Sequence, residues 1–200
     1  MESPPAVVLT RRYADAVGYA CEAHARQARK GTSVPYVAHL IGVSSLVLEA
    51  GGDEDLAIAA LLHDAAEDHG GEDRLADIDR RFGSRVEQIV RTCSDSLEPE
   101  GARKDDWETR KRHHLARLAA ASDDTLLVWM ADKVHNSRAI VTDLEVHGPG
   151  ILSRFHAAPD RILWYYEANL KLAEERHVPG AILVPLRDAV SRLRARLASS

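Results

Sequence analysis

One apolar run that ends in acidic residues and a histidine stands out as a place where the sequence could do chemistry. Residues 56–62 are apolar on every side, which predicts a helix running through the core. Four polar residues follow at helical spacing: His63, Asp64, Glu67 and Asp68. Carboxylates this close repel one another, the C-terminal end of a helix disfavours anions, and burial adds to the cost. A bound cation would resolve the conflict.

A second apolar run, residues 126–131, leads in the same way to Asp132, with His135 and Asn136 one turn later. A third segment places His39 among apolar neighbours. These three segments predict a metal site with four ligands: His39, His63, Asp64 and Asp132. Mixed imidazole and carboxylate ligands suit Mn²⁺, Fe²⁺ or Zn²⁺, whereas Ca²⁺ prefers oxygen ligands alone.

Glu67 and Asp68 come one turn after the predicted ligands, where a carboxylate could take a proton from an attacking water. A purely structural alternative is that the histidines and aspartates only pair with one another. Metal analysis of the purified chain would separate the two interpretations.

The elements that must position these residues follow a helical period almost throughout, which predicts an all-α bundle of about eight to ten helices. No alternating apolar pattern with an Asn-Gly or Asp-Gly turn favours a strand. The predicted helices are 10–31, 35–51, 54–68, 84–93, 106–121, 124–146, 160–177 and 185–198.

Length and composition restrict the class of protein. The 200 residues predict one domain, 1–200, with a core of about 10–178 and a C-terminal helix of about 185–198. A net charge of −5 argues against a nucleic-acid-binding protein, and two distant cysteines exclude a disulfide framework. No membrane span or signal peptide is evident, so we expect a cytoplasmic protein without a membrane partner. The oligomeric state stays open.

The motif residues resemble the hydrolase domain of RelA/SpoT proteins, a branch of the HD-domain phosphohydrolases with the pattern H…HD…D. Four blocks in family order carry the resemblance, and they lie at residues 24–39, 61–68, 81–95 and 130–138. The second reads Leu-Leu-His-Asp-Ala-Ala-Glu-Asp and the fourth Met-Ala-Asp-Lys-Val-His-Asn-Ser-Arg. The resemblance covers about residues 13–166 and leaves no room for a synthetase domain, which implies a stand-alone small alarmone hydrolase.

This resemblance implies a Mn²⁺-dependent enzyme that removes the 3′-pyrophosphate of guanosine tetra- or pentaphosphate, giving pyrophosphate and GDP or GTP. The four predicted ligands would hold the metal, while Glu67 and Asp68 would position and activate the attacking water. The substrate contacts that it implies are Arg29, Lys30, Asn136, Lys111, Arg161 and Tyr165. Several cations gathered at one cavity would attract an anionic nucleotide despite the negative net charge.

Some residues depart from the family pattern near the motif. Ala65 and Ala66 replace a bulkier apolar pair, and His69 stands where a threonine is usual. These changes could reshape the pocket, so several alternatives stay open. They are hydrolysis of an adenosine alarmone, removal of the 2′-phosphate of NADPH, a generic HD nucleotide phosphohydrolase, and a nucleotide-binding regulator without turnover.

Overall fold

The computed structural model describes residues 6–68, 70–95, 106–155 and 157–198. Within them the chain forms ten α-helices, one 3₁₀ helix and no strand, so the predicted all-α fold is confirmed. The elements are α1 (Arg11–Ala23), α2 (Val37–Glu49), α3 (Glu54–Leu62), α4 (Ala65–Asp68), α5 (Gly71–Phe82), α6 (Ser84–Cys93), α7 (Trp107–Ala119), α8 (Asp123–His147), η1 (Pro149–Arg154), α9 (Pro159–Glu175) and α10 (Gly180–Ala198).

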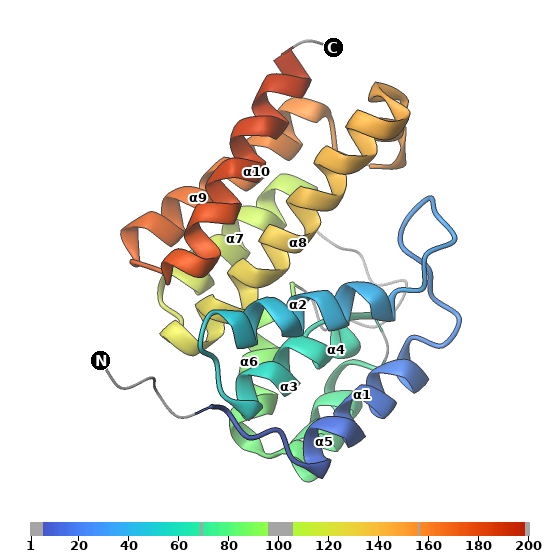
Figure 1. Cartoon of the computed structure of the whole chain (residues 1–200), viewed down its shortest axis with the longest axis vertical. Helices are drawn as coiled ribbons and strands as arrows, with labels where there is room; N and C mark the ends of the chain where they lie inside the picture. Colours follow the sequence, from blue (N-terminus) through green and yellow to red (C-terminus); the bar gives the residue numbers. More distant parts are fainter. Residues whose placement is uncertain (1–5, 69, 96–105, 156, 199–200) are drawn as a thin grey trace.

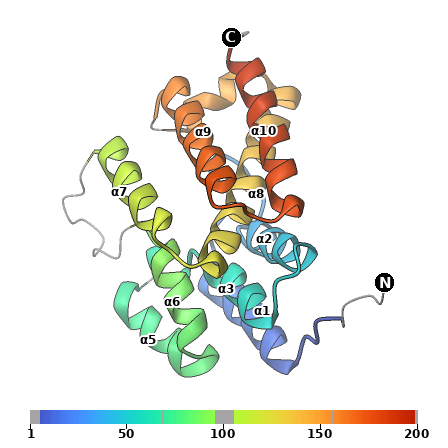
Figure 2. The same cartoon turned by 90° about the vertical axis from the view of Figure 1, so that its left-hand side faces the viewer.

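The long helix α8 connects the two halves of the bundle. It packs against α2, α3 and α6 on one side and against α9 and α10 on the other. Figure 1 shows α9 and α10 near the C-terminus at one end, with α1 and α5 at the opposite end. Figure 2 shows α7 standing to the side, and α7 packs on α9. Side chains from these helices can therefore meet along α8, between the two halves of the bundle.

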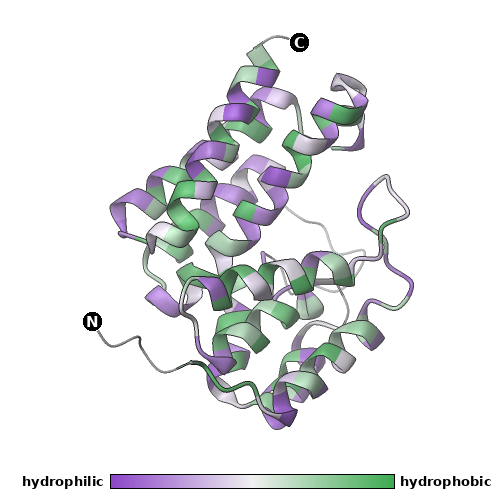
Figure 3. Ribbon diagram, viewed as in Figure 1, coloured by the Kyte–Doolittle hydropathy of each residue, from purple (hydrophilic) through white to green (hydrophobic). Residues whose placement is uncertain are grey.

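The apolar run predicted to cross the core does so. Every residue of 56–62 is buried in α3, and α3 packs against α1, α2, α6 and α8. Hydrophobic residues predominate along α2 and α3 at the centre of Figure 3. Packing on all sides holds α3 in place, and the candidate site begins at the residues that follow it.

The helices differ from the sequence prediction by more than two residues at four places. The first helix ends at Ala23 instead of continuing to residue 31, because the chain turns at His24, whose ring stacks on Tyr36 at 5.2 Å. The helix predicted over 54–68 breaks after residue 62 into α3 and α4. Helix α5 lies where the pattern predicts none. Helix α10 begins at Gly180 because backbone bonds to the Pro179 carbonyl start it before Pro185.

The segment between α1 and α2 folds back on itself as a narrow turn. Ala28 and Pro35 form an isolated bridge, and the Arg29 N–H donates to the Val34 carbonyl at 2.8 Å. Gly31 has a φ of 72°, a conformation that favours glycine. The turn places Arg29 next to α8, where its side chain donates a hydrogen bond to Asn136.

The longest helices of the described chain carry charged residues. α8 has 25 residues and α10 has 19. None of the helices in the described ranges combines the length and the apolar character that crossing a membrane requires.

Candidate active site

Two histidines and two aspartates converge where α2, α8 and the turn after α3 meet. His39 Nε2 lies 3.1 Å from Asp132 Oδ1 and 3.7 Å from Asp64 Oδ2. His63 Nε2 lies 3.0 Å from Asp64 Oδ2 and 3.6 Å from Asp132 Oδ1. The structure thus brings together all four side chains that the sequence predicts as metal ligands, and we call this group the His/Asp cluster.

The ring nitrogens of the cluster fit a cation. His63 Nδ1 donates to the Ala60 carbonyl at 2.8 Å, and His39 Nδ1 lies 2.9 Å from His135 Nδ1. With each proton on Nδ1, both Nε2 lone pairs face the carboxylates, as in a metal-ligating histidine. These buried Nε2 atoms make no hydrogen bond of acceptable geometry within the described residues. Such unpaired acceptors beside two carboxylates suit a divalent metal.

The electrostatics of the cluster keep both carboxylates ionised. Burial alone would raise the pKa of Asp132, but the Lys133 ammonium, 2.6 Å from its Oδ2, holds that pKa well below its usual range. Burial would also raise the pKa of Asp64, but the positive charge of a doubly protonated His63 lowers it, a charge that a bound cation would replace, and the Tyr36 hydroxyl donates to Oδ2 at 2.7 Å. Two negative charges therefore face the Nε2 atoms.

The predicted proton acceptor lies beside the cluster and outside it. Glu67 is in α4, and its Oε2 accepts a hydrogen bond from the Asp95 N–H at 2.8 Å. Burial raises the pKa of Glu67, and the charges of Asp64 and Asp95 raise it further. A raised pKa makes a carboxylate a better proton acceptor near neutral pH. The side chain of Asp68 lies outside the described residues, so its role stays a prediction.

A cavity of about 660 Å³ opens beside the cluster and is lined by His39 among others. This volume is typical of a small-molecule site. Five of the six predicted substrate contacts line it: Arg29, Lys30, Lys111, Asn136 and Tyr165. Arg161 does not line the cavity, and its half-exposed guanidinium lies 3.5 Å from Glu108 Oε2. Its predicted contact with substrate stays a prediction.

Hydrogen bonds join the cavity wall to the cluster. Arg29 donates to Asn136 Oδ1 at 2.8 Å, and Asn136 Nδ2 donates to Asp132 Oδ1 at 2.5 Å. At the other wall, Lys111 Nζ lies 5.4 Å from the centre of the Tyr165 ring. The buried Tyr165 hydroxyl has no hydrogen-bond partner within the described part of the chain. A donor left unpaired in a cavity wall is suited to a polar ligand.

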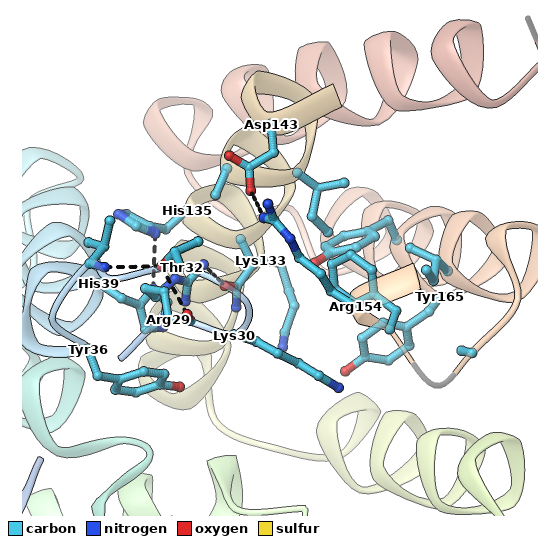
Figure 4. A pocket seen from close by; sticks show the side chains of 18 of the residues that line it. Arg29, Lys30, Thr32, Tyr36, His39, Lys133, His135, Asp143, Arg154 and Tyr165 are labelled. Atoms are coloured by element: carbon cyan, nitrogen blue, oxygen red, sulfur yellow. Dashed lines mark hydrogen bonds and ion pairs between the residues drawn. The ribbon is translucent and has the colours of Figure 1, made fainter. Parts of the chain in front are cut away.

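The structure adds site residues that the sequence prediction lacks. Lys133 lines the cavity and pairs with Asp132, and the one available signal was a lysine inside an apolar helix. Tyr36 and His135 support the two sides of the cluster, as Figure 4 shows for His135 and His39. Periodicity and motif spacing do not reveal these two contacts, because Tyr36 is 28 residues from Asp64 and His135 is 96 residues from His39.

Gly42 makes room for the His135 ring, and this predicts a strong effect of Gly42→Ala. A Cβ at Gly42 would lie 2.5 Å from His135 Nε2, so the ring must move away from His39. Burial lowers the pKa of His135 to about 4, and the charges of His39 and Arg29 contribute, so its neutral Nδ1 can accept from His39. Loss of such an outer support costs about 10- to 100-fold in metal affinity. Isothermal titration with Mn²⁺ measures the change.

Gly18→Ala is the matched control, because a Cβ at Gly18 in α1 meets no atom within 4 Å. We expect it to raise the free energy of unfolding by about 0.5–1 kcal/mol, as alanine does within helices, and to leave Mn²⁺ affinity unchanged. Equal metal affinity in the two variants would contradict the role of His135.

Comparison with known proteins gives a consistent assignment. A family model described as HD domain matches residues 16–148. The guanosine-3′,5′-bis(diphosphate) 3′-pyrophosphohydrolase MESH1 of Drosophila melanogaster is 34% identical over 141 residues, which cover 69% of this chain and 72% of that protein. The guanosine-3′,5′-bis(diphosphate) 3′-pyrophosphohydrolase of Aquifex aeolicus is 32% identical over 123 residues, which are 61% of this chain and 17% of that longer protein.

A solved structure supports the same assignment at the level of the fold. It belongs to a metazoan ortholog of SpoT that hydrolyses ppGpp and plays a role in starvation responses. The TM-score is 0.71 at 28% sequence identity, over 96% of this chain and 98% of that one. The likeness therefore extends over nearly the whole of both chains.

Proposed function

This chain belongs to the HD-domain family, and from that premise we propose that it hydrolyses guanosine-3′,5′-bis(diphosphate), releasing pyrophosphate from the 3′ position and leaving GDP. The observation that carries the proposal is a His/Asp cluster that opens into a cation-lined cavity of nucleotide size. The named activity of the similar proteins supports the same reaction. We propose that the partner is a small nucleotide and that the protein acts in the cytoplasm. A net charge of −5 disfavours binding to nucleic acid.

We propose Mn²⁺ as the cation, held by the His/Asp cluster. Two imidazoles and two carboxylates are a donor set that Mn²⁺ accepts, and the two unpaired Nε2 atoms support it. When bound, such a cation supplies positive charge that stabilises the negative charge developing on phosphoryl oxygens and makes water a better nucleophile.

The phosphates lie among the cations of the cavity. Arg29, Lys30 and Lys111 line it, and the buried ammonium of Lys133 lies between the cluster and the open cavity. Arg29, Lys111 and Lys133 are held by Asn136, Asp95 and Asp132, so these charges are in place before the substrate arrives and stabilise the transition state at little reorganisation cost. Arg29 donates a hydrogen bond to Asn136 and is oriented by it. A substrate phosphate that takes the place of the Asn136 oxygen therefore meets a guanidinium that already points toward it.

Glu67 accepts a proton from the attacking water. The water oxygen forms a bond to the phosphorus next to the ribose, and the bond from that phosphorus to the ribose 3′-oxygen breaks. The 3′-oxygen takes a proton from solvent, Glu67 returns the proton of the attacking water to solvent, and pyrophosphate leaves as one group. We propose that Asp68 assists in positioning the water, one residue beyond Glu67 on α4.

Turnover of three nucleotides side by side, in the presence of Mn²⁺ and with the products resolved, tests the proposed function. We expect pyrophosphate and GDP from guanosine tetraphosphate. Orthophosphate from NADPH alone would replace this reaction with a 2′-phosphatase, and turnover restricted to the adenosine alarmone would replace the substrate. No turnover of any of the three nucleotides with metal bound would contradict the proposed hydrolysis. It would favour a nucleotide-binding regulator or a nucleotidase for another substrate.

A further inference from the structure

An ion pair without a role in the proposed chemistry lines the cavity away from the His/Asp cluster. Arg154, at the end of η1, donates from Nη1 to Asp143 Oδ2 on α8 at 2.9 Å. Both side chains line the cavity, and Figure 4 shows them on the side opposite His39 and Tyr36. About a quarter of the Arg154 side chain and a third of the Asp143 side chain are exposed, so both can reach a ligand.

The pair is fixed by three separate segments of the chain. Arg154 lies against the backbone of Gly31, where an added Cβ would meet Arg154 Cδ at 2.6 Å. Gly31 belongs to the turn that also carries Arg29 and Lys30. The guanidinium is therefore held between this turn and α8, with its plane and its remaining N–H donors set before a ligand binds.

The register of α8 relates this pair to the catalytic end of the cavity. On α8, Asn136 lines the cavity next to the cluster residue Asp132, and Asp143 follows Asn136 by seven residues. At 1.5 Å per residue, about 10 Å of helix axis separates Asn136 from Asp143. Between them Ile140 lines the cavity, and Phe155 and Ile162 line it too. An apolar wall of this kind suits the flat face of a base, whereas the cations near Asn136 suit phosphates.

We propose that Asp143 and Arg154 recognise the base of the substrate as guanine, an inference that rests on the proposed function. The pairing edge of guanine presents two donors, N2–H and N1–H, followed by the acceptor O6. The two carboxylate oxygens accept from the donors and the adjacent guanidinium donates to O6. Adenine presents one donor and the N1 acceptor on that edge, which would face a carboxylate oxygen without a proton between them.

Asp143→Asn tests the proposal by exchanging one acceptor for a donor. The amide can donate to adenine N1, which the carboxylate cannot, and it keeps only one of the two acceptors for guanine, so the preference for guanine should fall. We expect the wild type to favour guanine nucleotides about 10- to 100-fold, and the variant to lose most of that preference. Two ratios are measured: kcat/KM for guanosine against adenosine tetraphosphate, and Kd for GDP against ADP by isothermal titration.

Asp188→Asn is the matched control, because Asp188 is an exposed aspartate on α10 and should leave both ratios unchanged. A shifted Kd ratio in Asp143→Asn supports base recognition even without turnover, in which case only the proposed hydrolysis fails. Turnover with the same ratios in Asp143→Asn and wild type overturns base recognition and leaves hydrolysis standing. Equal affinity of the wild type for GDP and ADP also overturns it.

Discussion

Replacing Asp132 with asparagine should reduce turnover of guanosine tetraphosphate about 10³-fold and remove most of the Mn²⁺ affinity. Asp132 Oδ1 faces both unpaired imidazole nitrogens, and its carboxylate supplies half of the anionic charge in the His/Asp cluster. Asparagine keeps the shape but loses the charge, and its one oxygen can accept from only one of the two donors, Lys133 at Oδ2 or Asn136 at Oδ1. Metal titration and steady-state turnover of the same preparation measure the two losses together.

Asp123→Asn is the matched control for this substitution. Asp123 lies on the same helix but is 88% exposed, so its loss should change neither metal affinity nor turnover. Thermal unfolding of both variants separates a lost ligand from a lost fold. An Asp132→Asn protein that binds Mn²⁺ as the wild type does would contradict the assignment of Asp132 as a ligand.

Replacing Glu67 with glutamine should lower kcat by about 10²- to 10⁴-fold while Mn²⁺ still binds, because a general base contributes in that range. The amide oxygen can still accept from the Asp95 N–H, so the local structure survives. Glu67 must be unprotonated to accept a proton. Burial raises its pKa, so turnover should fall as the pH decreases, starting at a higher pH than for an ordinary glutamate.

The pH profile distinguishes a proton acceptor from a structural residue. The remaining activity of Glu67→Gln should lack the acid limb, whereas Glu175→Gln, an exposed change on α9, should keep the wild-type rate and profile. Asp68→Asn is measured alongside. Normal hydrolysis by both Glu67→Gln and Asp68→Asn would show that the water is activated by other groups.

The sequence predicts the cluster because its residue types conflict with their surroundings. His63 and Asp64 follow an all-apolar run, and Asp132 ends another, so a metal site was the simplest way to accommodate the charges. Helical periodicity then predicts the all-α class. Both inferences depend on local spacing, which the sequence contains.

The remaining features depend on contacts between distant segments. After the break at Leu62, Asp64 lies against His39 of α2 and His63 against Asp132 of α8, which the 54–68 periodicity does not reveal. The support of His39 by His135 spans 96 residues, and the Asp143–Arg154 pair depends on the course of η1. Such pairings follow from packing between helices, which no motif spacing encodes.

A Mn²⁺ titration of chelator-treated protein, with metal content and turnover of guanosine tetraphosphate recorded at each point, tests the central claim most directly. If the His/Asp cluster is the catalytic metal site, activity appears in proportion to the first equivalent of bound Mn²⁺, and the products are GDP and pyrophosphate. Full turnover without bound metal, or a full equivalent of Mn²⁺ bound at the cluster without any release of pyrophosphate, would contradict it.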